Sequence, residues 1–316
     1  MTMDNPNVSV VLAVFNGERY LADSISSVIA QEYKDYEFII WDDGSTDKSG
    51  IIIDKYKDPR IKLFRNKNNL GLFTTLNLAI SKAKGRLIRL WSQDDIMKSF
   101  CLSEEVKFHN LHPEIGFSYC AVDYIDSLGR IIMEAPYDRT PEIVSSHLAA
   151  QIMTYYSSLA GNIASVMIKK EVLLDVGLFR QDMKVAGDFE MWVRITEKYP
   201  VGFIHKPLIY LRSHKEQFSR KRGVGTVFRK ETEEIYDSLF KRLPLELVVY
   251  AKKYVQWYNR IYYFHYGIHS LLIGDFKTFI EVYKEIIKRK EFLLSFFSWL
   301  ITLNAKFFRK KPKFII

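Results

Sequence analysis

The sequence predicts an α/β protein, with a mixed, mostly parallel sheet flanked by helices over residues 1–219 and a helical extension over residues 220–316. Strand-length apolar runs alternate with amphipathic stretches of helical period, which is the pattern of a largely parallel sheet. After Ser219 the period is helical almost throughout, and Pro244 and Pro312 are the only prolines. A length of 316 residues with 48% hydrophobic content allows one large domain and an extension.

The first half of the chain supplies the clearest elements. Buried strands are expected at residues 8–14, 36–41, 61–64 and 86–91, with helices at 21–29, 47–57 and 72–83 between them. We expect Gly85 to end the third helix as a C-cap. Further along, the pattern predicts irregular strands over 115–133, helices at 141–156, 170–176 and 189–199, and strands at 163–169, 201–204 and 208–211.

Paired aspartates follow two of these strands. Asp42 and Asp43 end the second strand, and Asp94 and Asp95 end the fourth. Ligands of open α/β sheets collect at the carboxyl ends of the strands. If the two strands are neighbours, four carboxylates converge, and a divalent cation or a set of donors must compensate them. The alternative is that the first pair only forms a turn and the second only caps a helix starting near Lys98.

Five short motifs lie in a fixed order along the chain, at residues 8–16, 41–47, 69–71, 92–95 and 187–188. Each motif is weak alone, but the ordered set resembles the family 2 glycosyltransferases over roughly residues 6–219. These are inverting enzymes of the GT-A fold that use nucleotide sugars. The resemblance implies roles for individual residues in binding the nucleotide, holding a metal and transferring a proton.

The resemblance assigns the end of the first two strands to the nucleotide. Asp43 would accept the N–H between the two carbonyls of uracil or thymine, and Asp42 would be a structural or ribose-side neighbour. Ala13 and Phe15 would line the base pocket, where Phe15 stacks on the base unless it is simply core. Arg65 would reach the diphosphate unless it is only a solvated surface cation.

A second group is implied for a metal. Asp95 would hold Mn²⁺ or Mg²⁺, and Asp94 would contact the ribose or help to place the metal. His214 would reach the metal or the diphosphate, and Arg212 an acid or a phosphate near it. Ser92 stands where the family often has an aspartate.

Asp188 corresponds to the catalytic base of the family. Inversion by direct displacement needs a carboxylate that removes the proton from the acceptor hydroxyl as its oxygen attacks the anomeric carbon. The family commonly has Glu-Asp at this position, whereas this chain has Gly187 before Asp188. The alternative is that Asp188 only caps a helix beginning at Phe189.

Charge and hydropathy set the extension apart. Residues 220–316 carry 20 Lys and Arg against 9 Asp and Glu, while the formal net charge of the whole chain is +9. Residues 292–303 have no charged side chain and are flanked by basic clusters, so residues 288–316 could contact a membrane surface peripherally or form a core helix. A helix pair hinged at Gly274 and Asp275 could support a homodimer. No nucleic-acid motif accompanies the charge, and nucleic acid is not an expected partner.

The two cysteines and the polar start of the chain favour a cytoplasmic protein without a secretory signal. The resemblance, together with the basic and apolar tail, implies transfer of one sugar from a UDP- or dTDP-sugar to a hydroxyl of a lipid-linked or surface-polysaccharide glycan. The processive synthases of this family carry a Gln-x-x-Arg-Trp element. This chain lacks the element, so polymerisation is not expected. The alternative is a non-catalytic nucleotide-sugar or glycan-binding protein on the same scaffold. Dinucleotide oxidoreductases and P-loop enzymes are excluded because their glycine-rich motifs are missing.

Overall fold

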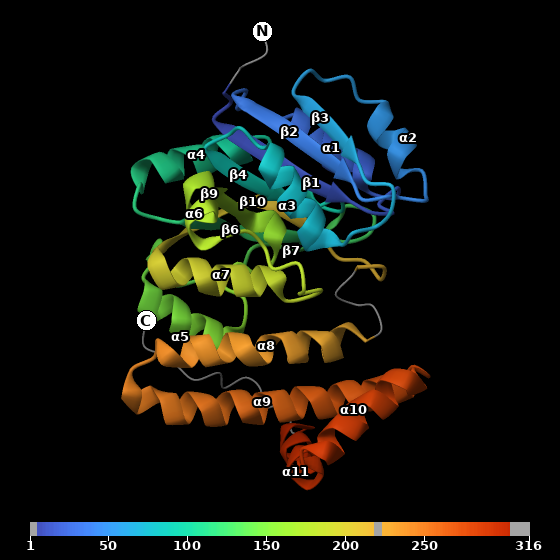
Figure 1. The fold of residues 1–316 in the computed structure, drawn as a ribbon, viewed down its shortest axis with the longest axis vertical. Helices are drawn as coiled ribbons and strands as arrows, with labels where there is room; N and C mark the ends of the chain where they lie inside the picture. Colours follow the sequence, from blue (N-terminus) through green and yellow to red (C-terminus); the bar gives the residue numbers. More distant parts are fainter. Residues whose placement is uncertain (1–4, 218–222, 304–316) are drawn as a thin grey trace. The chain divides into compact units, whose positions relative to one another are not determined.

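The computed structural model describes residues 5–217 and 223–303 (Figure 1). The chain divides into two compact units. The first comprises residues 1–149 and 158–214, and the second comprises residues 150–157 and 215–316. The predicted boundary between residues 219 and 220 lies outside the described residues. Helix α5 (Ser146–Tyr156) passes from the first unit to the second after Ala149.

In the first unit, ten strands of the described chain form one sheet of order β3-β2-β1-β4-β9-β6-β10-β5, with β7 beside β6 and β8 beside β10. The pairs β1–β2, β1–β4, β2–β3 and β6–β10 are parallel, and the other pairs are antiparallel. The strands are β1 (Val8–Val14), β2 (Tyr36–Asp42), β3 (Ile61–Arg65), β4 (Leu87–Trp91), β5 (Ile96–Met97), β6 (Phe117–Ile125), β7 (Ile131–Met133), β8 (Ile143–Val144), β9 (Val166–Lys169) and β10 (Val201–Arg212).

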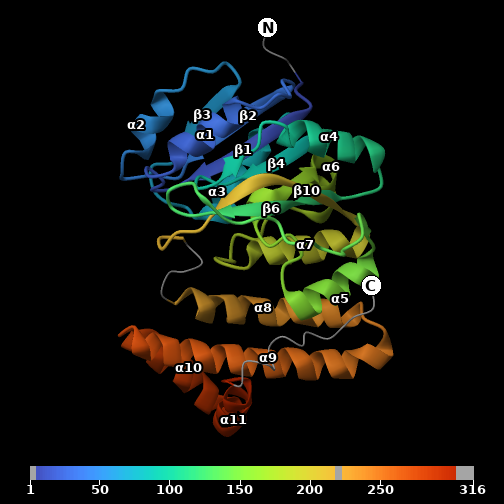
Figure 2. The same cartoon turned by 180° about the vertical axis from the view of Figure 1, so that it is seen from behind.

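Helices cover both faces of this sheet (Figures 1 and 2). Val8, Val10, Leu12 and Val14 of β1 share one core with α1 and α4, whereas α3 packs on β1 and β2 from the other side. Strands covered on both faces need mostly apolar side chains, and β1, β2 and β4 are apolar runs interrupted by one buried polar residue each, Ser9, Glu37 and Arg89. The helices of this unit are α1 (Leu21–Ile29), α2 (Ser49–Asp54), α3 (Leu72–Lys82), α4 (Cys101–Leu111), the 3₁₀ turn η1 (Ile163–Ser165), α6 (Lys170–Val176) and α7 (Gly187–Lys198).

Three local predictions were wrong. Helix α3 ends before the extended residue Ala83, and Gly85 is not its C-cap. A Cβ at Gly85 would lie 2.5 Å from the backbone nitrogen of Ser9, so close packing on β1 requires this glycine. The predicted helix at 141–156 begins only at Ser146, after strand β8. The two strands predicted around Pro207 are one strand, β10, with register shifts at that residue.

The second unit is helical. After α5 it contains α8 (Val224–Lys241), α9 (Leu245–Leu272), α10 (Phe276–Lys288) and α11 (Phe292–Leu303). The predicted hinge between α9 and α10 is confirmed: Gly274 has φ +74°, and the Asp275 carboxylate accepts a hydrogen bond from the backbone N–H of Thr278 at 3.2 Å.

One face of α11 is packed and the other is exposed. Phe296 and Trp299 pack against the core of Tyr263, Phe264, Val282 and Ile286, which joins α11 to α9 and α10. Leu293, Leu294 and Phe297 on the same helix are 55–66% exposed. One face of α11 therefore packs as the core interpretation predicts, while contact of the segment with a membrane surface stays a prediction.

Candidate active site

The carboxyl end of β2 is a turn built by its two aspartates. Asp42 Oδ1 accepts the backbone N–H of Ser45 at 3.0 Å, and Gly44 follows with φ +71°. A Cβ at Gly44 would lie 2.7 Å from the carbonyl carbon of Asn68, so the turn needs glycine for its conformation and for its close approach to the loop after β3. Both aspartates are buried.

Asp43 holds that loop. Its Oδ1 accepts hydrogen bonds from Asn66 Nδ2 at 2.7 Å and the Leu70 N–H at 2.9 Å, and its Oδ2 accepts the Gly71 N–H at 2.9 Å. An ionised carboxylate accepts about four hydrogen bonds. These three bonds therefore leave Asp43 capacity for one further donor, which is what the predicted contact with a base N–H requires.

Arg65, at the end of β3, lies beside acids of its own unit. Its Nη2 is 2.6 Å from Asp54 Oδ1, and its Nε is 3.9 Å from Asp42 Oδ2. The side chain is partly exposed at 44%. A contact of Arg65 with a diphosphate would thus compete with these two carboxylates.

The ends of β1 and β4 are joined by one side chain that sequence reasoning did not single out. Gln93 Oε1 accepts the Phe15 N–H at 2.9 Å, and Gln93 Nε2 donates to the Phe15 carbonyl at 3.2 Å. The backbone of Phe15 is thereby fixed while its ring is 39% exposed, so Phe15 is not a core residue. Ala13, two residues earlier on β1, is half-buried. An exposed ring beside the end of β2 is suited to stacking on a planar ligand.

The second pair of aspartates is linked to the end of β10. The backbone N–H of Arg212 donates to Asp95 Oδ1 at 2.8 Å, and Arg212 Nε donates to the Asp94 carbonyl at 2.9 Å. The alternative that these aspartates cap the next helix is wrong, because α4 begins only at Cys101. Burial, aided by the neighbouring Asp94 charge, raises the pKa of the Asp95 carboxyl to about 7 even though hydrogen bonds from Arg212 and Ser92 act in the opposite direction.

Arg212 and His214 complete this corner. The Arg212 guanidinium is buried, lies 3.1 Å from Asp23 Oδ2, and stacks over the Tyr20 ring with its carbon 4.4 Å from the ring centroid. The His214 ring lies 4.8 Å from the same tyrosine ring, and its Nε2 is 3.6 Å from Asp94 Oδ2. The structure therefore brings Asp94, Asp95, Arg212 and His214 together.

Asp188 lies in the first turn of α7. The helix begins at Gly187 after Ala186, so Asp188 does not precede the helix as its N-cap, and the alternative that it only caps a helix beginning at Phe189 is wrong. Its Oδ1 accepts the N–H of Phe189 at 2.7 Å. A glycine is needed at position 187 for steric reasons, because a Cβ there would lie 2.6 Å from Cε2 of Phe73 on α3. The glutamate that the resemblance leads one to expect before the base has no room here.

The two aspartate pairs are not on neighbouring strands, because β1 lies between β2 and β4. In the described residues, no three His, Cys, Asp or Glu side chains form a group that could by itself hold a metal ion. Asp94, Asp95 and His214 still offer the carboxylate and imidazole donors that Mn²⁺ accepts, and diphosphate oxygens can supply further ligands of such a cation. The donor chemistry of these residues therefore suits a divalent cation.

Gln93, Asn66, Tyr20 and Asp23 are supporting residues that sequence reasoning missed. Their partners lie 23 to 194 positions away in the chain, so no local sequence pattern predicts them. Gln93 is the exception, because it belongs to the motif at residues 92–95.

Solved structures share this fold. The structure of residues 1–349 of TarS from S. aureus with UDP-GlcNAc superposes with a TM-score of 0.60 at 17% identity, over 90% of this chain and 92% of that one. This chain spans 42% of the longer TarS structure. A mannosyltransferase of Pyrobaculum calidifontis with GDP-Man and Mn²⁺ gives a TM-score of 0.54 at 15% identity, over 94% and 87% of the two chains. The fold is the GT-A fold of glycosyltransferases.

Sequence comparison narrows this class. The family model described as "Glycosyl transferase family 2" matches residues 9–160 of this chain. A putative glycosyltransferase of Bacillus subtilis, EpsE, is 40% identical over 258 residues, which are 78% of this chain and 87% of EpsE. An uncharacterized glycosyltransferase of Methanocaldococcus jannaschii is 31% identical over 218 residues, 66% of this chain and 72% of the relative. The chain belongs to glycosyltransferase family 2, and it is an enzyme of that class.

Proposed function

We propose that this enzyme transfers one sugar, with inversion, from a UDP- or dTDP-sugar to a hydroxyl of a lipid-linked or surface-polysaccharide glycan. The observation that carries the proposal is that acidic residues lie at three positions in the first unit: Asp43 after β2, Asp94 and Asp95 after β4, and Asp188 in the first turn of α7. TarS is described in complex with UDP-GlcNAc, which supports a uracil nucleotide as donor.

Each of these positions has a role in this proposal. The remaining acceptor position of Asp43 would bind the imide N–H of uracil or thymine, which cytosine lacks. Asp95 and Asp94, with His214, would hold Mn²⁺ or Mg²⁺, which when bound neutralises the charge of the departing diphosphate. The mannosyltransferase described with Mn²⁺ supports this donor set. Asp188 would take the proton of the acceptor hydroxyl as its oxygen attacks the anomeric carbon.

The base is tested with Asp188→Asn. We expect the substitution to lower kcat for transfer by about 10²–10⁴-fold, the usual contribution of a general base, while donor affinity measured by calorimetry stays within a factor of a few. Asp182→Asn is a matched control, because its carboxylate is exposed and paired with Arg180 in the same segment of the chain. Near-normal turnover by Asp188→Asn would assign the base to another group.

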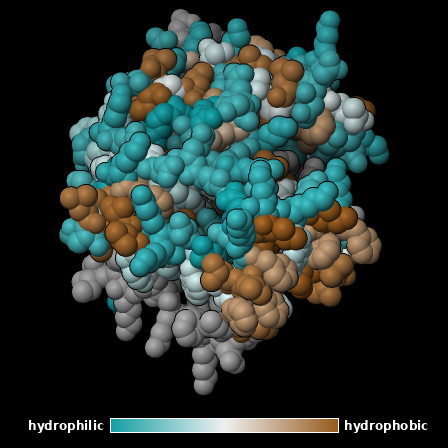
Figure 3. All heavy atoms as spheres, turned by 60° about the horizontal axis from the view of Figure 1, so that its bottom comes forward, coloured by the Kyte–Doolittle hydropathy of each residue, from teal (hydrophilic) through white to brown (hydrophobic). Residues whose placement is uncertain are grey.

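The second unit supports a peripheral position at the inner face of the cell membrane. We define its apolar–basic face by eleven exposed apolar and lysine residues at the end of α9 and on α10 and α11, which the exposed Glu281 accompanies on α10: Leu272, Ile273, Phe276, Lys277, Ile280, Lys284, Ile287, Lys288, Leu293, Leu294 and Phe297. Figure 3 shows hydrophobic residues gathered at its lower right, where α9 ends and α10 begins. No helix in the described part of the chain has the length and apolarity needed to cross a bilayer.

Such a face fits an anionic lipid surface, because apolar side chains enter the interface while lysines meet the headgroups. The predicted contact region at residues 288–316 is described only as far as residue 303. We expect the protein to float with vesicles that contain phosphatidylcholine and the anionic lipid phosphatidylglycerol, and the double variant Leu293→Ser, Leu294→Ser to float less. If the variant instead loses a dimer seen by light scattering and vesicle binding is unchanged, the face is a homodimer interface.

The competing class is a non-catalytic nucleotide-sugar or glycan-binding protein on this scaffold. Membership of an enzyme family argues against it, and turnover of any donor would exclude it. A screen of UDP-, dTDP- and GDP-sugars with Mn²⁺ provides that measurement and identifies the donor.

A further inference from the structure

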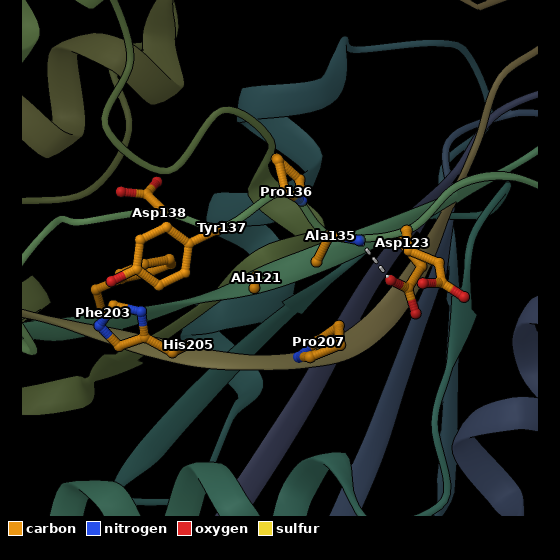
Figure 4. A pocket seen from close by; sticks show the side chains of 10 residues that line it. Ala121, Asp123, Ala135, Pro136, Tyr137, Asp138, Phe203, His205 and Pro207 are labelled. Carbon is orange, nitrogen blue, oxygen red and sulfur yellow. Dashed lines mark hydrogen bonds between the residues drawn. The ribbon is translucent and has the colours of Figure 1, made fainter.

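A cavity lies on the sheet of the first unit, apart from the residues of the candidate active site. It has a volume of about 670 Å³ and opens between β6, β10 and the loop at residues 134–138 (Figure 4). This volume is within the ~300–1,000 Å³ typical of small-molecule sites. None of the residues proposed for the nucleotide, the metal or the base lines it.

The floor of the cavity is produced by the irregularity in β10. The register against β6 shifts on both sides of Pro207, which cannot donate a hydrogen bond to the neighbouring strand. Phe203, His205 and Pro207 line the cavity (Figure 4), whereas Lys206 between them pairs with Glu104 of α4 at 2.8 Å. The strand thus presents two rings and a pyrrolidine to the cavity and its cation to the other face.

The rings form a fixed aromatic surface. Phe203 stacks on Tyr119 of β6 with centroids 4.8 Å apart and an angle of 22° between the planes. His205 lies 4.5 Å from Phe203. From the opposite wall Tyr137 projects with 89% of its surface exposed. A pyranose ring packs its polarised C–H groups on aromatic faces of this kind.

The opposite wall is tied to the sheet. Asp123 Oδ1 accepts the N–H of Ala135 at 2.8 Å (Figure 4), and Asp123 Oδ2 lies 2.6 Å from Lys98 Nζ. Asp138 Oδ1 accepts the N–H of Thr140 at 2.8 Å, which shapes the turn after Tyr137. The bond from Ala135 ties the start of the segment to β6, which reduces the ordering cost of binding a ligand.

The charge of the lining selects the chemistry of the ligand. Three carboxylates line the cavity, of Asp123, Glu134 and Asp138, and there is no lysine or arginine among its lining residues. Lys98 compensates Asp123, which leaves Glu134 and Asp138 as acceptors for hydroxyl or amino groups. A phosphate, a nucleotide or an anionic headgroup would be repelled.

We propose that this cavity binds an uncharged or amino-sugar unit of the acceptor glycan, remote from the hydroxyl that receives the new sugar. The proposal rests on the proposed function. Asp123 precedes Ile125 by two residues, about 7 Å along a strand, and Ile125 is the register partner of Arg212. A glycan with one unit in the cavity can therefore extend along β6 and β10 toward the corner that contains Asp94 and Asp95.

The experiment uses the full chain on an array of bacterial surface glycans with uncharged, amino-sugar and anionic members. Affinities for the best binders are then measured by calorimetry. The variants are Tyr137→Ala and the double variant Glu134→Gln, Asp138→Asn, and the control is Leu128→Ala, which changes an exposed residue in the nearby turn between β6 and β7. Donor affinity and melting temperature are measured for each protein.

We expect binding of uncharged or amino-sugar glycans and at least ~10-fold weaker binding by Tyr137→Ala, the size of effect that an anchoring aromatic residue produces. The control should bind as the parent protein does. Binding of no such glycan at millimolar concentration, preference for anionic members, or loss of donor affinity in parallel with glycan affinity would overturn the inference.

The two proposals fail separately. Donor turnover without glycan binding would leave the proposed function standing and remove the sugar site. Glycan binding that depends on Tyr137, without turnover of any donor, would remove the acceptor role and with it the proposed function.

Discussion

Phe73 on α3 and Gly187 on α7 form a steric pair that determines where Asp188 lies. An added Cβ at Gly187 would lie 2.6, 2.8 and 2.9 Å from three ring carbons of Phe73. Carbon atoms in contact are normally about 3.5–4.0 Å apart, so the ring would have to retreat by roughly 1 Å. Phe73 is buried and stacks on Phe179, whose carbonyl accepts a hydrogen bond from Asn77 Nδ2 and whose N–H donates to Asn77 Oδ1, so the ring has little freedom to move.

The substitution Gly187→Ala therefore tests the packing. Overpacking a core costs typically about 1–3 kcal/mol, whereas alanine in place of glycine in a helix gains at most about 1 kcal/mol. We expect the free energy of unfolding to fall by about 1–2 kcal/mol. We also expect kcat to fall, because Asp188 follows directly and shifts with the turn.

A double-mutant cycle with Phe73→Leu isolates the contact. Removing the ring should make Gly187→Ala neutral or stabilising, with a coupling energy of about 1–3 kcal/mol measured by urea unfolding. Donor affinity serves as the control, since neither residue is placed at the nucleotide. If Gly187→Ala is stabilising while Phe73 is present, or if the two substitutions are additive, the steric account is refuted.

Three further predictions concern charged groups. Asp95→Asn keeps an acceptor but loses the charge, so we expect Mn²⁺ affinity in the presence of UDP, measured by calorimetry, to fall by about 10–100-fold; unchanged affinity would remove Asp95 from the metal site. Burial alone would raise the pKa of Glu37, but hydrogen bonds from Lys62 and two other donors outweigh it and lower the pKa. The ionised Glu37 therefore contributes to the free energy of unfolding above its unfolded-state pKa, and this contribution is lost as the pH falls through its folded-state pKa. Glu37→Gln should cost about 1–3 kcal/mol in urea unfolding at neutral pH and less in acid, and an equal cost under both conditions would contradict this. Glu105→Ala leaves the buried Arg89 without its carboxylate partner at 2.8 Å and should cost about 3–5 kcal/mol, while joint replacement of both by apolar residues should cost much less.

The sequence predicts the central strands well and the outer ones poorly, for a physical reason. β1, β2 and β4 are covered on both faces and are apolar at most positions, a signal that is visible in the chain itself, with Ser9, Glu37 and Arg89 as the buried polar exceptions. The continuity of β10 through Pro207 depends on its pairing with β6, and the need for glycine at position 85 depends on the approach of Ser9. Neither contact can be recognised from a local pattern in the sequence.

The same distinction applies to the candidate site. The acids could be proposed from the sequence because their positions follow from strand ends and motif order. The residues that fix them could not, since Arg212 meets Asp23 across 189 positions and Gln93 meets Phe15 across 78. The residue that excludes a glutamate before Asp188 is Phe73, on a helix far earlier in the chain. Side-chain roles that depend on a tertiary partner need the fold.

The two aspartate pairs differ in how their charge is compensated, and this difference distinguishes their roles. Asp43 receives three hydrogen bonds from the segment at residues 66–71, so the pair on β2 is stabilised by donors of the protein. Asp95 receives hydrogen bonds from the Arg212 backbone and the Ser92 side chain, yet burial beside Asp94 still raises its pKa to about 7. A carboxylate that is buried with few donors gains most from a cation, because the cation favours the ionised form that burial disfavours. A divalent ion would therefore stabilise the end of β4 far more than the end of β2, which supports the assignment of the metal to Asp95 and of the nucleotide base to Asp43.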